Sequence, residues 1–192
     1  CFQGRGKICS FGYVITDDSF RILEQRDIPM NPRSRFYLAG RGNRPGITLA
    51  YTEEEFKRCP SFSYYYSEIS ELLRRPDQMI FGYSVSGDAG FLASEWERYQ
   101  TKPVDFRFYD VQRILTDYKE LQNTPSLVHG AEAFGVQESQ EVHKSDEDAR
   151  ITMEVLRGLC NETGLTAAEL IEKYPHCIGD CIAGKITTKY KE

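Results

Sequence analysis

The order of the short apolar runs and helical patterns constrains the fold of this chain most. Residues 8–15 (ICSFGYVI) and 20–28 (FRILEQRDI), separated by the polar turn TDDS, predict a strand hairpin. Residues 79–85 are nearly all apolar, residues 104–111 (VDFRFYDV) look like another strand, and each run is followed by apolar residues at helical spacing. A hairpin followed by strands that alternate with helices predicts an α/β layer architecture with a mixed sheet.

The remaining segments are predicted from helix signals and breakers. We expect an exposed loop after Pro29, in a stretch rich in Arg, Gly and Pro, and a helix after Pro60. Ser126 to Phe134 is expected to be helical, with Gly135 as its left-handed cap. The last helical patterns begin at Ser145, as an N-cap, and at the capping box TAAE of residues 166–169, before a tail from Pro175 that we expect to be irregular.

Composition narrows the class of protein. A chain of 192 residues with 40% hydrophobic and 28% charged residues suits one globular domain, and no apolar run approaches the roughly 20 residues of a membrane span. Residues 1–7 lack the apolar core of a signal peptide, so we expect a cytoplasmic protein with reduced thiols and no membrane partner. The formal charge of −5 argues against coating nucleic acid through a broad basic surface. An acidic nuclease remains possible because bound cations reverse the local charge.

Three side chains are candidates for metal-dependent chemistry. Two-metal cleavage of a phosphodiester needs several carboxylates that converge on cations about 4 Å apart. Asp88 follows the apolar run 79–85, which places it at the carboxyl edge of the predicted sheet, although an Asp that opens a helix is also an ordinary capping residue. His143 and Asp148 flank the start of the helix predicted after Ser145, so they could face one pocket.

These residues stand in segments that resemble a known family. The sequence ICSFGYVITDDSFRI looks like the second and third strands of the DEDDh class of DnaQ-like 3′-5′ exonucleases, which have a ribonuclease H-like fold. FGYSVSGDAGFL resembles the family's second motif, and HKSDEDA resembles the third, in which a His precedes the last Asp by five positions. The resemblance runs from about residue 8 to residue 160 and implies a three-layer α/β/α fold with a central mixed sheet.

The resemblance also implies a function and a role for each candidate residue. Asp88 and Asp148 would hold a pair of Mg²⁺ or Mn²⁺ ions, and His143 would act as general base toward the attacking water. The substrate would be the 3′ end of single-stranded DNA or RNA. Asp110, near the end of a predicted strand, is interpreted as structural. We expect residues 1–163 to form the exonuclease domain and residues 164–192 to form a short helical extension and tail; the oligomeric state is left open.

The family's first motif, Asp-x-Glu on the first strand, has no match in the sequence. Because that strand lies at the centre of the family's sheet, we expect a short apolar strand with Asp-x-Glu upstream of Cys1. The alternative is a binding or scaffold module that keeps the nuclease fold without catalysis. A generic nucleotide-binding domain is a weaker alternative, since no glycine fingerprint follows a predicted strand.

Overall fold

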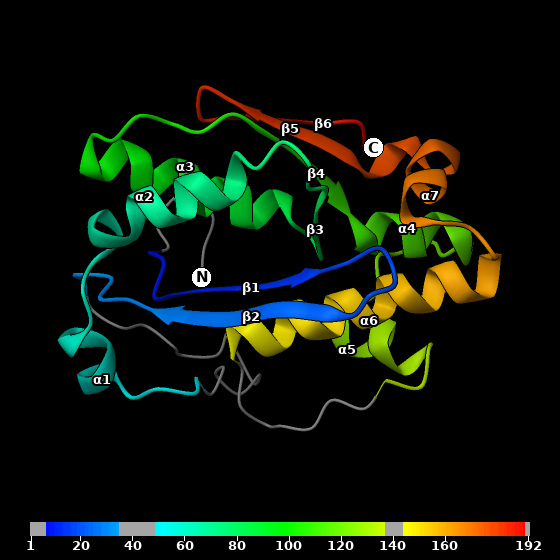
Figure 1. Ribbon diagram of the computed structural model, residues 1–192, viewed down its shortest axis with the longest axis horizontal. Helices are drawn as coiled ribbons and strands as arrows, with labels where there is room; N and C mark the ends of the chain where they lie inside the picture. Colours follow the sequence, from blue (N-terminus) through cyan, green and yellow to red (C-terminus); the bar gives the residue numbers. More distant parts are fainter. Residues whose placement is uncertain (1–6, 35–48, 137–143, 191–192) are drawn as a thin grey trace.

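The computed structural model describes residues 7–34, 49–136 and 144–190. These residues form an α/β protein in which a strand hairpin precedes alternating helices and strands (Figure 1). The elements are β1 (Ser10–Thr16), β2 (Ile22–Pro29), α1 (Glu53–Arg58), α2 (Phe62–Leu73), β3 (Ile80–Gly82), α3 (Ser86–Tyr99), β4 (Phe106–Asp110), α4 (Val111–Tyr118), α5 (Leu127–Glu132), α6 (Ser145–Thr163), α7 (Ala167–Lys173), a 3-10 turn (Pro175–Cys177), β5 (Ile178–Ile182) and β6 (Lys185–Thr188).

The strands form two separate ladders. β1 and β2 pair antiparallel, from Ser10 opposite Pro29 to Ile15 opposite Glu24, with an irregularity before Thr16. The second ladder has the order β3-β4-β5-β6, in which β3 is parallel to β4 and the other pairs are antiparallel. This mixture of parallel and antiparallel pairing confirms the mixed sheet that the sequence predicts.

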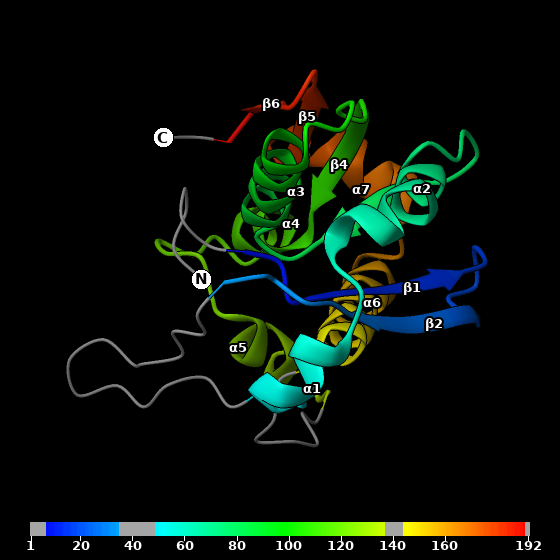
Figure 2. The same cartoon turned by 90° about the vertical axis from the view of Figure 1, so that its left-hand side faces the viewer.

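Helices cover both faces of the four-stranded ladder. On one face, Phe106 and Phe108 of β4 pack with Leu92 and Trp96 of α3. On the other face, Tyr109 belongs to a second cluster that includes apolar residues of α4, α6 and α7. In Figure 2, α3 lies to one side of β4 and α7 to the other, while α6 lies along the β1–β2 hairpin. The arrangement is a three-layer α/β/α structure.

The C-terminal tail differs from its expectation. We expected an irregular segment from Pro175, but residues 178–188 form the β5–β6 hairpin, and β5 pairs with β4 across Phe108 and Gly179. A second difference is α1, which lies between the loop and the helix that the sequence predicts, where no helix was expected. The capping box that Thr52 forms with Glu55 marks the start of this helix. We missed it because the preceding residues have the composition of a loop.

Most helix ends follow the sequence signals. Ser126 caps α5 through its side chain, Gly135 and Gly164 have φ of 67° and 70°, and Thr166 forms the expected capping box with Glu169. The start of α6 is one residue earlier than expected, because Lys144 rather than Ser145 occupies the N-cap position.

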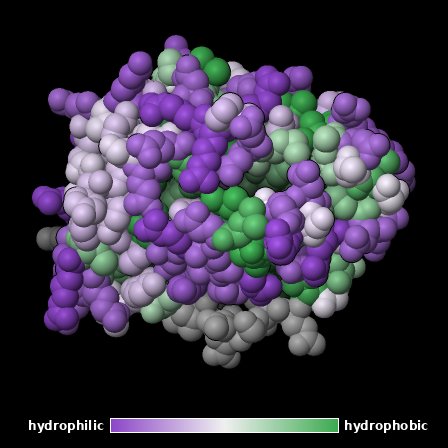
Figure 3. Space-filling model, in the orientation of Figure 1, coloured by the Kyte–Doolittle hydropathy of each residue, from purple (hydrophilic) through white to green (hydrophobic). Residues whose placement is uncertain are grey.

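The surface fits the composition. In the described residues, no helix combines the length and apolar character needed to cross a bilayer. The face in Figure 3 is mostly hydrophilic, with an apolar area over the β1–β2 hairpin.

The packing of β5 on β4 predicts a position that cannot accept a side chain. A Cβ at Gly179 would lie 2.2 Å from ring atoms of Phe108, which is fully buried. We expect Gly179→Ala to lower the free energy of unfolding by about 1–3 kcal/mol, measured by denaturant titration of the purified chain. Gly90→Ala is the matched control, because nothing lies within 4 Å of a Cβ there and alanine favours the helix. Equal stability of the two variants would contradict the C-terminal hairpin as part of the sheet.

Candidate active site

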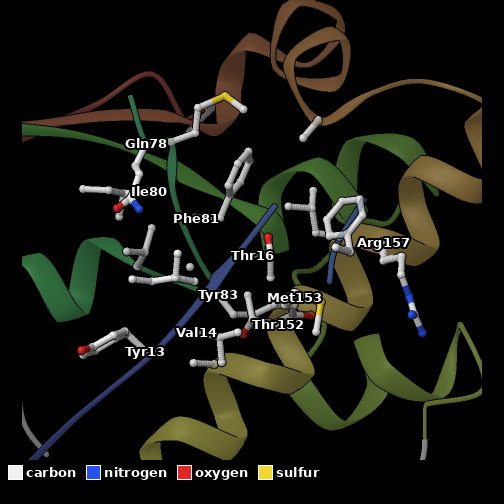
Figure 4. A pocket seen from close by; sticks show the side chains of 18 of the residues that line it. Tyr13, Val14, Thr16, Gln78, Ile80, Phe81, Tyr83, Thr152, Met153 and Arg157 are labelled. Carbon is white, nitrogen blue, oxygen red and sulfur yellow. The ribbon is translucent and has the colours of Figure 1, made fainter. Parts of the chain in front are cut away.

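A groove of about 1300 Å³ lies between the two ladders. β1 lines one wall along its whole length, β3 lines the other, and α3 and α6 close the floor with residues such as Leu92 and Leu156. Figure 4 shows Tyr13, Val14 and Thr16 along β1 and Ile80 and Phe81 of β3 among the residues that line this space. Most lining residues are apolar, and Asp88 and Asp148 line the same groove.

Asp88 reaches the groove through the junction of β3 and α3. Ser84 has φ of 56°, a left-handed conformation that turns the chain from the strand into the helix. Asp88 then lies in the first turn of α3. Its side chain remains accessible from the groove, as a ligand must be. Withdrawal of the carboxylate from bulk water, together with the charges of Asp110 and Asp148, raises its pKa from the ordinary value of 3.8 to about 6.

Asp148 reaches the same place from the first turn of α6. The charge of Asp148 acts on Asp88, so the structure brings together two of the three predicted site residues although they lie far apart in the chain. The start of α6 is held by Asp27 of β2, whose carboxylate accepts hydrogen bonds from Ser145 at 2.5 Å, from Ser10 and, at 2.7 Å, from Tyr51. This network fixes α6, and therefore Asp148, against the hairpin.

Asp110 has the structural role that the sequence indicates. It is 1% exposed, and its Oδ1 accepts hydrogen bonds from the backbone N–H groups of Ser84 and Gln112, both at 3.0 Å. Asp110 therefore caps α4 and holds the turn that leads to Asp88. Its Oδ2 accepts a hydrogen bond from the hydroxyl of Tyr190 at 2.8 Å. Burial of Asp110 raises its pKa, and these donors oppose that rise.

The sequence analysis missed Tyr190. Its ring lies 4.5 Å from the Arg113 guanidinium, and burial beside Asp110 raises the pKa of its phenol. Nothing local in the final residues, TTKYKE, indicates that this tyrosine contacts the junction that positions Asp88. The contact depends on the β5–β6 hairpin, which returns the chain to the sheet.

The third predicted residue, His143, lies outside the described residues, one position before Lys144. Within residues 7–34, 49–136 and 144–190, no three His, Cys, Asp or Glu side chains gather closely enough to hold a metal ion. Asp88 and Asp148, which line the same groove, have hard oxygen donors that suit Mg²⁺ or Mn²⁺. Their mutual repulsion is the kind that a bound cation relieves. The described donors thus fit part of a metal site.

Comparisons with known proteins identify the class to which this fold and groove belong. A family model described as exonuclease (RNase T) matches residues 45–156, a range that contains Asp88, His143 and Asp148. The crystal structure of a full-length 3′-exonuclease superposes with a TM-score of 0.68 at 12% identity, covering 98% of this chain and 85% of that chain. At this identity the likeness shows the fold. No curated protein shows significant similarity to the chain.

The fold is therefore the ribonuclease H-like α/β fold, as the resemblance implied. The chain belongs to the DnaQ-like exonuclease family, because the family match covers more than half of its length. This membership makes it a nuclease, and it makes nucleic acid the class of substrate.

The contact between Tyr190 and Asp110 predicts that the C-terminal hairpin stabilises the site. Tyr190→Phe removes one donor from a buried carboxylate, so we expect a loss of about 1–3 kcal/mol in the free energy of unfolding. The control is Tyr64→Phe, the same change on a ring that is 74% exposed. Thermal unfolding of both variants measures the difference, and a Tyr190→Phe protein as stable as the control would contradict the anchoring role.

The raised pKa of Asp88 predicts a pH dependence of the metal-free chain. Because the folded chain binds this proton more tightly than the unfolded chain, charged Asp88 destabilises the fold above pH 6, and this penalty disappears below the ordinary pKa of 3.8. Since the side chain is open to the groove, we expect an effect of only ~1 kcal/mol, which corresponds to about 2–4 °C. In EDTA, Asp88→Asn should therefore melt higher than the parent at pH 7.5, and the gap should close toward pH 4.

The matched control for this pH series is Asp18→Asn, in the exposed turn between β1 and β2. It should follow the parent curve at every pH. A gap for Asp88→Asn that stays constant with pH would show that the charge of Asp88 is not its cause.

Proposed function

We propose that this chain is the core of a metal-dependent 3′-5′ exonuclease that removes nucleotides from the 3′ end of single-stranded DNA or RNA. The observation that carries the proposal is that Asp88 and Asp148 line one groove, where withdrawal from water and the charges of Asp110 and Asp148 raise the pKa of Asp88. Carboxylates forced together in this way are poised to bind cations, and the exonuclease family normally uses divalent metals.

In this proposal each residue has one task. Asp88 and Asp148 would hold Mg²⁺ or Mn²⁺, which would supply charge stabilisation for the attacking and leaving oxygens. His143 directly precedes the segment that leads into α6, and it accepts the proton of the attacking water. Asp110 and Tyr190 stay outside the chemistry and hold the β3–α3 turn in place. Further acids on a strand upstream of Cys1 would complete the donor set.

The activity is tested with the natural full-length protein and a 5′-labelled single-stranded oligonucleotide. We expect stepwise shortening in Mg²⁺ and none in EDTA. His143→Ala and Asp148→Asn should each reduce the rate by about 10²–10⁴-fold, the contribution of a general base or a charge-stabilising group. His129→Ala, an exposed position on α5, should retain the parent rate.

The same variants separate the nuclease from a scaffold that keeps the fold alone. A catalytic site binds divalent ions through its acids, so calorimetric titration with Mn²⁺ should show binding that Asp148→Asn weakens. Absence of both metal binding and shortening would contradict the proposal and favour the binding module.

A further inference from the structure

The first turn of α3, which carries Asp88, is held from the C-terminal hairpin. The hydroxyl of Tyr190 donates to Oδ2 of Asp110 at 2.8 Å, and the same phenol has a side-chain hydrogen bond with Ser86, the first residue of α3. The other oxygen of Asp110 accepts a hydrogen bond from the N–H of Ser84 at 3.0 Å. Tyr190 therefore reaches the start of this helix twice, directly at Ser86 and through Asp110 at Ser84.

The carboxylate of Asp88 depends on this turn for its position. Burial and the charges of Asp110 and Asp148 raise its pKa, and none of the described residues donates a hydrogen bond to it. Ser84 has φ of 56°, a conformation that a residue with a side chain adopts rarely and that persists only where the surroundings hold it. A carboxylate without a described hydrogen bond moves with the backbone that carries it. The contacts that fix residues 84–86 therefore also fix the place of Asp88.

The hairpin that delivers Tyr190 is fastened along its length. β5 pairs with β4, and β6 contacts α3 (Figure 2). At the hairpin turn, the N–H of Ala183 donates to the carboxylate of Asp105 at 2.7 Å. The N–H of Lys189 donates to the carbonyl of Ile178 at 2.9 Å, so the chain stays bonded to β5 up to the residue before Tyr190. Backbone pairing thus places the phenol at the β3–α3 turn.

The ring of Tyr190 has a contact that does not involve its hydroxyl. The guanidinium of Arg113, in the first turn of α4, lies 4.5 Å from the centre of the ring. A cation over an aromatic face attracts it whether or not the ring carries a hydroxyl. Tyr190→Phe therefore removes the hydrogen bonds to Asp110 and Ser86 and keeps the ring beside Arg113. This makes it a selective test of what the hydroxyl does.

We propose that Tyr190 is a positioning residue for the metal site, through which the C-terminal hairpin sets the affinity of Asp88 for a divalent cation. This inference rests on the proposed function, because it takes Asp88 as a metal ligand. It goes beyond the stability of the fold, since coupling between two binding events is reciprocal. Docking of the hairpin strengthens metal binding, and metal binding strengthens the docking. Displacement of the hairpin from Asp110 then converts the site to a state of lower affinity.

The affinity is measured by calorimetric titration of the natural full-length protein with Mn²⁺, well below its melting temperature. Groups that hold a metal ligand from behind typically contribute 10–100-fold to affinity, and Tyr190 acts one group further away, so we expect Tyr190→Phe to bind Mn²⁺ about 3–10-fold more weakly. Tyr64→Phe, the same change on an exposed ring, should bind like the parent. Thr166→Ala removes the helix cap of α7 and lowers stability far from the β3–α3 turn, and it should also bind like the parent.

The route through Asp88 is tested by combining variants. In an Asp88→Asn background, Tyr190→Phe should change the affinity for Mn²⁺ by less than about twofold, because the ligand that the tyrosine positions is gone. Equal weakening in both backgrounds would show that the tyrosine acts elsewhere and would overturn the proposal. The reciprocal effect is read by NMR: Mn²⁺ should slow amide exchange at Lys189 in the parent and not in Asp88→Asn. Exchange at Lys189 that does not respond to Mn²⁺ would contradict the coupling.

The metal dependence of the rate separates positioning from a general defect. With limiting Mn²⁺, Tyr190→Phe should shorten the labelled oligonucleotide about 3–10-fold more slowly than the parent, and saturating Mn²⁺ should restore the rate. A deficit that saturating Mn²⁺ leaves unchanged would overturn the proposal. A parent that neither binds Mn²⁺ nor shortens the oligonucleotide would refute the proposed function and this inference with it. A parent that does both, with Tyr190→Phe at the parent's affinity, would overturn the inference alone, so the two failures are distinguishable.

Discussion

The close approach of α6 to β1 is the contact on which the site depends. A Cβ at Gly12 would lie 2.1 Å from the carbonyl carbon of Ser145, so the first turn of the helix rests directly on the strand backbone. Any larger residue would push the helix away. Asp27 then fixes the helix start through the hydroxyls of Ser10 and Ser145. Because Asp148 lies one turn further on, a backbone contact and a hydrogen-bond network together decide where this carboxylate stands.

The acids at the start of α6 divide into two groups with different surroundings. Asp146 and Glu147 both accept hydrogen bonds from Gln25 of β2, and each also pairs with a basic residue of its own segment. These two bind the helix to the hairpin. Asp148 instead lines the groove with Asp88. Negative charge in a first turn is favoured by the helix dipole, but that benefit does not explain why a second carboxylate from another helix is placed beside it. The cation of the proposed function would account for the pairing.

The sequence predicted those parts of the fold that depend on local signals. The helix starts set by Ser126 and by the capping box at Thr166 appear where the residues indicate them, whereas α5 ends at Glu132, before Phe134 and the Gly135 expected to cap it. The β5–β6 hairpin could not be predicted in this way, because IGDCI has a weak strand pattern. Gly179 is required there by the ring of Phe108 on a neighbouring strand, which is a contact between distant parts of the chain. The role of Tyr190 could not be predicted for the same reason, because its contact with Asp110 joins distant parts of the chain. Local signals predict the individual helices, whereas the arrangement of the strands depends on contacts between residues that lie far apart in the sequence.

The groove places the candidate metal-binding acids at one edge of the four-stranded ladder. β3 ends at the edge of the sheet that leads to Asp88. Asp110 holds the turn before Asp88, and Asp27 holds the start of the helix that carries Asp148. Because the fold is held by these two acids and not by Asp148 itself, Asp148→Asn should weaken the proposed metal binding alone.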